Sequence, residues 1–235
     1  MTDQTFDTTI NWTEYWDGAD EETRTKTAPA AQLTLDPLES FVETVAQPGA
    51  VADVGCGPGT VPFRMAERFP EASVVGYDAA EPVLQENRER ASEEDHQNLS
   101  FERTVLPEFE PGRSFDLVTC FYTLTYVEEI ETALAALYDA VAPGGHLVFT
   151  YHNRFAHQHF RKIAADPHEH LGPESPWDPD NFADRFELLV EGENLLSHER
   201  IHDTLGTWPQ SIWSVAGEDD RYAAWRHNPM VYVPK

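Results

Sequence analysis

The stretch Val51-Ala52-Asp53-Val54-Gly55-Cys56-Gly57-Pro58-Gly59-Thr60 decides the fold. A short apolar run ends in an acid, three glycines follow at alternate positions, and an amphipathic segment then runs from Val61 to Phe69. This order predicts a buried strand, a tight turn and the start of a helix. Glycine allows positive φ and, because it has no Cβ, lets a ligand approach the backbone closely. The free N–H groups at the helix start would attract a carboxylate or a phosphate.

The spacing of the glycines discriminates between ligands. A dinucleotide-binding turn reads G-x-G-x-x-G, but Thr60 stands where its last glycine should be. A P-loop would need Gly-Lys-Ser or Gly-Lys-Thr after the turn, and this sequence lacks it. A glycine-rich turn without a ligand is the plain structural alternative. Three glycines next to the acid Asp53 exceed what a turn needs, and they favour a ligand-binding turn.

Strands and helices alternate beyond this turn, which predicts a parallel sheet with helices on both faces. Right-handed crossovers would bring the loops that follow the strands to one edge of the sheet. Before the turn we expect a helix from a cap at Asp36 to Ala46. Further strands are expected at residues 73–77, 99–103, 115–120, 146–151, 196–203 and 230–233. Helices are expected from Glu81 and over residues 130–141, 155–165 and 182–191, with a loop at 166–180.

Asp78 is a second candidate for ligand binding. It ends the apolar run from Val74 to Tyr77, about 20 residues beyond the glycine turn. In doubly wound sheets an acid at that distance accepts hydrogen bonds from ribose hydroxyls. The alternative is that Asp78 caps the helix that opens at Glu81. The pairing with the glycine turn favours the ribose role.

Four motifs in this order resemble class I S-adenosylmethionine-dependent methyltransferases of the small-molecule type. They are the glycine turn, Asp78, Ser114-Phe115-Asp116-Leu117-Val118 and Val141-Ala142-Pro143-Gly144-Gly145-His146-Leu147. The resemblance covers roughly residues 50 to 151. It implies an α/β fold with a doubly wound, mostly parallel seven-stranded sheet, Rossmann-like, with helices on both faces and an antiparallel last strand. It also implies S-adenosylmethionine as the cofactor and methyl transfer to a small, apolar or aromatic acceptor.

The resemblance also implies which residues bind the cofactor. Asp53 and the glycine turn would hold its methionine end, with Cys120 beside them, while Asp78 would hold the ribose and Ala79 would flank the adenine. Many relatives have an aspartate after the third strand for the adenine amino group, and this sequence does not. The residues concerned are therefore Asp53, Gly55, Cys56, Gly57, Gly59, Asp78, Ala79 and Cys120, with Glu102 or Thr104 as substitutes for the missing aspartate.

Catalytic candidates come from the loops after the fourth and fifth strands. A sulfonium methyl needs chiefly an aligned nucleophile and a water-free site, and a general base only if the acceptor is protonated. We name Tyr122 and His152 as catalytic candidates, with Tyr126 nearby. Tyr122 could equally form a wall of the pocket, and His152 could be a loop histidine bonded to backbone. No carboxylate neighbours His152 in sequence, so we favour alignment over base catalysis.

Aromatic residues outside the central region have two possible roles. In the family that the sequence resembles, the N-terminal arm and late insertions cover the cofactor and shape the acceptor pocket, and aromatics suit a flat or apolar acceptor. The alternative is packing within the domain. The residues are Trp12, Tyr15, Trp16, Trp208, Trp213, Tyr222 and Trp225. We expect a single domain over residues 1–235, with an N-terminal arm at 1–47, a cofactor-binding core at 48–151 and later elements at 152–235.

The composition limits the partners. Acids number 42 against 16 lysines and arginines, for a formal net charge of −26, which disfavours nucleic acid and acidic membranes. A lysine-poor, acidic chain resembles the proteins of salt-accumulating halophiles. The histidines lack metal-ligand spacing, so we expect no metal. We expect free thiols at both cysteines and a soluble, cytoplasmic protein, since no leader or long apolar run is evident. The alternatives are a nicotinamide-dependent oxidoreductase and a non-catalytic, cofactor-binding partner subunit.

Overall fold

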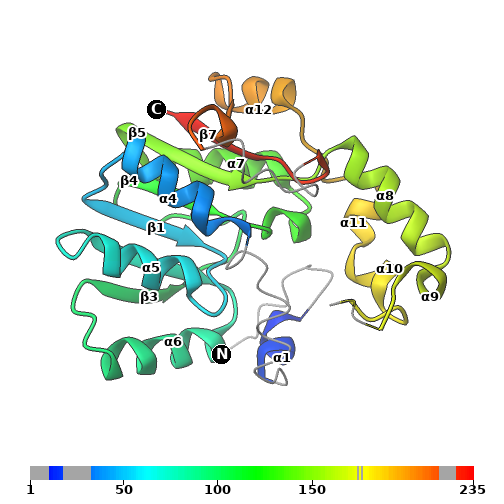
Figure 1. The fold of residues 1–235 in the computed structure, drawn as a ribbon, viewed down its shortest axis with the longest axis horizontal. Coiled ribbons are helices and arrows are strands. Elements are labelled where there is room, and N and C mark those ends of the chain that lie inside the picture. Colours follow the sequence, from blue (N-terminus) through cyan, green and yellow to red (C-terminus); the bar gives the residue numbers. More distant parts are fainter. Residues whose placement is uncertain (1–10, 18–32, 174, 176, 217–225) are drawn as a thin grey trace.

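The central element is a seven-stranded sheet with the strand order β3-β2-β1-β4-β5-β7-β6. The computed structural model describes residues 11–17, 33–173, 175, 177–216 and 226–235 (Figure 1). Strands β1 to β5 pair in parallel, β7 pairs antiparallel with β5, and β6 pairs antiparallel with β7. This confirms the predicted fold class with its antiparallel last strand. The strands are β1 Ala50–Val54, β2 Ser73–Asp78, β3 Leu99–Arg103, β4 Phe115–Cys120, β5 Val141–Thr150, β6 Gln210–Ser211 and β7 Met230–Pro234.

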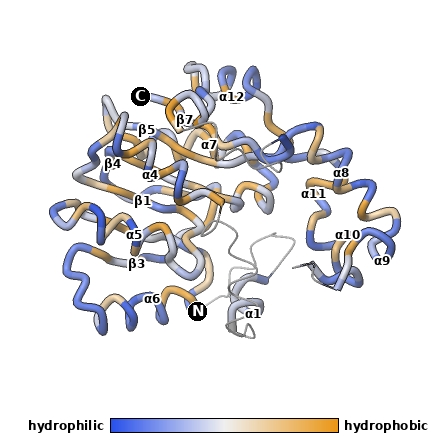
Figure 2. The backbone as a smooth tube through the Cα atoms, viewed as in Figure 1, coloured by the Kyte–Doolittle hydropathy of each residue, from blue (hydrophilic) through white to orange (hydrophobic). Residues whose placement is uncertain are grey.

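Helices cover both faces of the sheet, because alternate strand residues are apolar on both sides. Val51 packs with the side of α4, α5 and α6, whereas its neighbour Ala52 packs with the side of α7 and α12. Figure 2 shows hydrophobic stretches along the central strands and a mainly hydrophilic α6 at the periphery. The helices concerned are α4 Leu35–Thr44, α5 Thr60–Arg68, α6 Glu81–Glu93, α7 Ile130–Asp139 and α12 His198–Leu205.

A separate lobe lies beyond the carboxyl ends of the strands (Figure 1). Its own apolar cluster is centred on Phe160, Phe182 and Phe186. The α1 helix lies past the same edge, and Asn11 caps it, because the Asn11 Oδ1 accepts from the Glu14 N–H at 3.3 Å. The elements are α8 Arg154–Ala165, α9 Pro167–His170, α10 Phe182–Arg185 and α11 Glu187–Glu191 in the lobe, with α1 Trp12–Asp17.

The expected strand at 196–203 is wrong, since this segment forms α12. The Ser197 Oγ accepts from the Arg200 N–H at 3.2 Å, and Gly206 ends the helix with φ +71°. Ile201 is the buried residue of α12, and a single buried position in eight does not have the alternation of a strand. Serine and glycine at the two ends are ordinary helix-capping signals, which the sequence therefore did contain. The sixth strand is instead the short β6.

Strand β5 begins at Val141, five residues before the predicted start, and α7 ends at Asp139. Residues 143–145 lie inside the strand, where the register with β4 shifts between Phe115 and Leu117. Gly144 has φ +85°, and its N–H donates to the Lys235 carbonyl at 2.7 Å. A proline and a positive-φ glycine are tolerated in a strand at such an irregularity, so β5 can include residues that the sequence places before the strand.

Three smaller boundaries also differ from expectation. The N-cap of α4 is Thr34, and Asp36 lies inside the first turn. The predicted helix over 182–191 is interrupted at Phe186, which separates α10 from α11. Short α9 lies within the predicted loop at 166–180. Among the described residues, no helix is both long enough and apolar enough to cross a membrane.

Candidate cofactor and acceptor site

The glycine turn is folded back on the end of β2. The N–H groups of Gly55 and Cys56 both donate to the Tyr77 carbonyl, at 2.7 and 2.9 Å. Gly55, Gly57 and Gly59 have φ values of +77°, +47° and +79°, so all three adopt the conformation that glycine accepts most readily. The turn also leaves no room at its first glycine, because a Cβ there would lie 1.9 Å from the Thr123 Oγ1.

Asp78 fastens this turn to the end of β2. Its Oδ2 accepts from the Gly57 N–H at 2.8 Å and its Oδ1 from the Ala80 N–H at 3.0 Å. Burial raises the pKa of Asp78, and the backbone N–H groups work against that rise. The N-cap of α6 is Ala80, and Asp78 lies two residues before it. The carboxylate therefore does not fill the capping position that was its alternative role, and two oxygens retain acceptor capacity for further donors.

Asn87 is a part of this turn that sequence reasoning missed. Its Nδ2 donates to the Gly57 carbonyl at 2.8 Å, so Gly57 is held through its N–H by Asp78 and through its carbonyl by Asn87. The side chain is 4 % exposed. The available signal was its spacing, because Val83, Asn87 and Ala91 recur at four-residue intervals on the buried side of α6. A polar residue within such an apolar stripe needs a buried partner.

Asp53 is the second buried carboxylate at this edge, and it is 3 % exposed. The Thr119 hydroxyl on neighbouring β4 donates to its Oδ1 at 2.6 Å. Burial raises the pKa of Asp53 to about 7, while the Thr119 hydrogen bond works in the opposite direction and the charge of Asp78 adds to the rise. A desolvated carboxylate gains most from a nearby cation, so this position favours a positively charged group.

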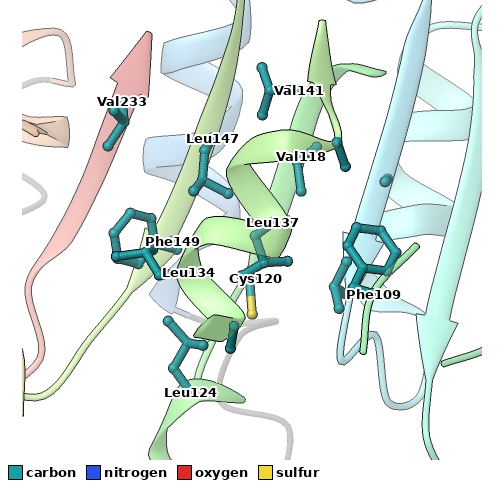
Figure 3. Packing of buried hydrophobic residues seen from close by; sticks show 14 of the residues in the cluster. Phe109, Val118, Cys120, Leu124, Leu134, Leu137, Val141, Leu147, Phe149 and Val233 are labelled. Atoms are coloured by element: carbon teal, nitrogen blue, oxygen red, sulfur yellow. The ribbon is translucent and has the colours of Figure 1, made fainter. Parts of the chain in front are cut away.

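Both cysteines are free and buried, in agreement with the sequence. The Cys56 thiol lies in the glycine turn, and burial raises its pKa, with Asp78 and Asp53 adding to the rise. Cys120 is fully buried in the apolar cluster under α7, between Leu124, Leu137 and Phe109 (Figure 3). Burial likewise raises the pKa of Cys120. Neither thiol is therefore prepared to act as a nucleophile.

The end of β3 brings one of the two adenine candidates next to Asp78. The Thr104 N–H donates to the Asp78 carbonyl at 3.0 Å, which places Thr104 at the carboxyl edge of the sheet. Glu102 lies inside β3, paired with Tyr77, and its side chain is exposed. Ala79 is half-buried, and its carbonyl accepts from the Arg103 Nε at 2.9 Å.

The two catalytic candidates also lie close to each other in the fold. Tyr122 directly follows β4 with φ +59°, and its N–H donates to the Thr150 Oγ1 at the end of β5. His152 lies two residues after Thr150, and its Nδ1 is 2.9 Å from the Thr125 Oγ1. Burial lowers the pKa of His152 to about 4, and the nearby His227 adds to this effect. The ring is therefore neutral at pH 7, and a hydroxyl rather than a backbone group is its partner.

The α1 helix covers the glycine turn. Trp16 is 5 % exposed, packs with Ala80 and Val83, and lies 3.6 Å from where a Cβ on Gly57 would be. Trp12 meets Tyr126 edge-on, with ring centroids 4.7 Å apart. The same helix thus contacts both the glycine turn and the loop after β4.

The remaining aromatic candidates lie in different environments. Trp213 is half-buried against the cluster that contains α4, and Trp208 is exposed and stacked on His202. Tyr222 and Trp225 lie outside the described residues. Within the described part of the chain, no group of three or more His, Cys, Asp or Glu side chains could hold a metal ion.

Comparison with known proteins shows that the segment containing the site matches a family model. Residues 52–147 match the family model described as a methyltransferase domain. This segment resembles a methyltransferase domain. It runs from β1 into β5 and contains the glycine turn, Asp78 and Tyr122.

Relatives at the sequence level are named methyltransferases. The chain is 34 % identical over 161 residues to a trans-aconitate 2-methyltransferase of Variovorax paradoxus, which covers 66 % of this chain and 57 % of that protein. It is 35 % identical over 106 residues to a ubiquinone biosynthesis O-methyltransferase of Acinetobacter baumannii, covering 44 % of each chain. The chain thus spans about half the length of the curated relatives that it matches.

Solved structures show the same fold. Magnesium protoporphyrin IX methyltransferase from Synechocystis PCC 6803, solved with bound S-adenosylhomocysteine, aligns with a TM-score of 0.60 at 16 % identity, covering 92 % of this chain and 88 % of that one. The N-methyltransferase NodS from Bradyrhizobium japonicum, also with S-adenosylhomocysteine, aligns with a TM-score of 0.60 at 15 % identity, covering 97 % of this chain and 98 % of that one. At these identities the likeness concerns the fold.

Proposed function

We propose that this protein transfers a methyl group from S-adenosylmethionine to a small acceptor. The observation that carries the proposal is the glycine turn held by Asp78, within a segment that matches the methyltransferase domain. The relatives are named for methyl transfer, and two structural neighbours were solved with the demethylated cofactor. An oxidoreductase is disfavoured, because the turn lacks the last glycine of the dinucleotide pattern.

The residues at the carboxyl edge fit this cofactor. The two buried carboxylates, Asp53 and Asp78, favour cations and hydroxyl donors, which match the amino group and the ribose of S-adenosylmethionine. Thr104 is the better candidate for the adenine end, because its N–H bonds to the Asp78 carbonyl while Glu102 points into solvent. Cys120 would contribute through its backbone, since its thiol is enclosed in the cluster under α7.

The acceptor would lie between α1, the loop after β4 and the lobe. Tyr126 joins these parts, because its ring contacts Trp12 of α1 and stacks, with centroids 5.9 Å apart, on Phe186 between α10 and α11. Aromatic side chains provide flat, apolar walls, which suit an apolar or aromatic acceptor. The relatives are named for trans-aconitate and for ubiquinone biosynthesis, and these names also favour a small-molecule acceptor.

Catalysis would rest chiefly on alignment and exclusion of water. S-adenosylmethionine, when bound, supplies a methyl group on a sulfonium that is already activated. Tyr122 adopts a backbone conformation that is rare for non-glycine residues, at the strand end where sites form in this architecture. The half-buried His152 is neutral at pH 7 and could hydrogen-bond an acceptor through Nε2 while Thr125 orients its ring. With a pKa of about 4, it would be a weak general base.

Release of S-adenosylhomocysteine tests the proposal. The protein should release it from S-adenosylmethionine in the presence of trans-aconitate or of a small aromatic acceptor, and hardly at all without an acceptor. Tight cofactor binding with no turnover across a broad panel of acceptors would favour the alternative of a non-catalytic partner subunit. Hydride transfer from a nicotinamide cofactor would contradict both.

A further inference from the structure

An open pocket lies against α8. Its volume is about 460 Å³, within the usual range for small-molecule sites. One wall is a stripe of α8 residues at helical spacing, and the other is the segment that leads into β7. The lining residues are Phe155, Gln158, His159, Arg226 and His227.

Asn153 holds the two walls together. Its Nδ2 donates to the Arg226 carbonyl at 2.8 Å, and its N–H donates to the His227 carbonyl at 3.3 Å. Its Oδ1 caps α8 by accepting from the Phe155 N–H at 2.9 Å. The relative position of the walls is therefore fixed by hydrogen bonds, and a ligand would not have to assemble the pocket.

The charge of the pocket is opposite to that of the chain. The chain carries 42 acids and 16 lysines and arginines, yet among the residues that the structure describes no carboxylate lines this pocket. Among the described residues, Arg226 forms no ion pair. The rings of His159 and His227 stack with centroids 4.9 Å apart and an interplanar angle of 16°. Burial lowers the pKa of His159, and the nearby His227, Lys162 and His170 add to this effect.

These groups point to one class of ligand. A guanidinium is suited to bind a carboxylate, and the ring nitrogens of His159 and His227 and the Gln158 amide offer further hydrogen-bonding groups beside it. Phe155 is 44 % exposed and offers a ring face beside these donors. We propose that this pocket binds a small aromatic carboxylate, with the carboxylate at Arg226 and the ring against Phe155.

This site does not depend on the proposed methyl transfer. Its lining comes from α8 and residues 226–227, and none of the residues assigned to the cofactor or to catalysis belongs to it. Binding can therefore be measured on the full chain without cofactor or acceptor. A lack of binding in this pocket would leave the methyltransferase proposal intact. A lack of methyl transfer would likewise leave the proposed binding in this pocket intact.

Titration with benzoate, followed by NMR at constant ionic strength, tests the proposal. Saturable binding is expected, and Arg226→Gln should weaken it about ten-fold or more, since a hydrogen bond to a charged group contributes about 1.5–3 kcal/mol. Arg161→Gln is the matched control, because it removes the same charge from an exposed position of α8 outside the pocket. It should leave benzoate affinity unchanged. Phe155→Ala should weaken benzoate binding and leave acetate binding unchanged. Circular dichroism establishes that each variant is folded.

Four results would overturn this assignment. Benzyl alcohol has the same ring without the charge, and equal affinity for it would remove the role of Arg226. Inorganic phosphate that binds as tightly as benzoate would remove the role of the ring. Equal loss in the Arg161→Gln and Arg226→Gln variants would show a general effect of net charge. Absence of saturation with benzoate would remove the site.

Discussion

The backbone N–H of Gly57 donates to the Oδ2 of Asp78 at 2.8 Å, across 21 positions of sequence. One carboxylate thereby orders the turn that would receive the methionine end of the cofactor and stands where the ribose would lie. A change at Asp78 should therefore affect both the shape of the turn and direct contacts with the ligand.

Asp78→Ala should weaken binding of S-adenosylhomocysteine by roughly 1.5–3 kcal/mol, about one to two decades, as measured by calorimetry. Asp78→Asn keeps an acceptor oxygen and should lose less affinity for S-adenosylhomocysteine. Asp116→Ala is the matched control, because the Asp116 Oδ2 also accepts from two backbone N–H groups, those of Gly49 and Ala50, at 2.8 and 2.9 Å. That control should lose stability and keep its cofactor affinity. Equal affinities in all variants would leave Asp78 with a structural role alone.

Gly55→Ala should destabilise the fold much more than Gly144→Ala. Both glycines have positive φ, at +77° and +85°, so the conformational cost is similar, about 1–2 kcal/mol. A Cβ at Gly55 would also collide with the Thr123 side chain, whereas nothing lies within 4 Å of a Cβ at Gly144. Such overpacking should add roughly 1–3 kcal/mol. Urea denaturation measures the difference, and equal losses would mean that the turn can move away from Thr123.

Asp53→Asn should change how stability depends on pH. The folded-state pKa of Asp53, about 7, lies above its unfolded value of 3.8. The native protein thus binds this proton more tightly, and its contribution to stability is lost as the pH rises through 7. The stability of the variant relative to wild type should therefore increase by roughly 2 kcal/mol between pH 5 and pH 8. His152, whose lowered pKa acts in the opposite direction, is present in both proteins and cancels. Parallel curves of unfolding free energy against pH would contradict the assignment.

His152→Asn should lower turnover by about ten-fold or less if the ring only aligns the acceptor. General-base catalysis would instead predict a loss of roughly 10²–10⁴. It would also predict that the wild-type rate declines only as the pH falls toward about 4, since the ring stays neutral above that value. Thr125→Val keeps the imidazole and removes its hydroxyl partner, so it should raise KM more than it lowers kcat. A large loss with a pH profile centred near 4 would decide against alignment.

The central fold could be predicted from the sequence because its signals are local. Apolar runs ending in an acid or in glycine marked β1 and β2, and the predicted limits of β3 and β4 match the structure. The region after β5 was harder. A strand was expected at 196–203, although Ser197 and Gly206 cap a helix there, and the strand expected from residue 146 begins at Val141 and includes Pro143.

The site followed from sequence only in part. Asp78 and the glycines were evident from spacing, and the structure connects them directly. Asn87, Thr119 and Thr125, which hydrogen-bond to Gly57, Asp53 and His152, could not be predicted from the sequence. Each of them acts between elements that only the folded chain brings together. The burial that shifts the pKa values of Asp53 and His152 is likewise a property of the fold. The roles of the cofactor residues, the domain limits and the halophilic origin stay predictions.

Calorimetric titration of the full chain with S-adenosylhomocysteine and with NAD⁺, in molar salt because of the net charge of −26, tests the central claim most directly. We predict saturable binding of S-adenosylhomocysteine with one site per chain and no heat of binding from NAD⁺. Measurable binding of NAD⁺, with no response to S-adenosylhomocysteine or S-adenosylmethionine, would contradict the account.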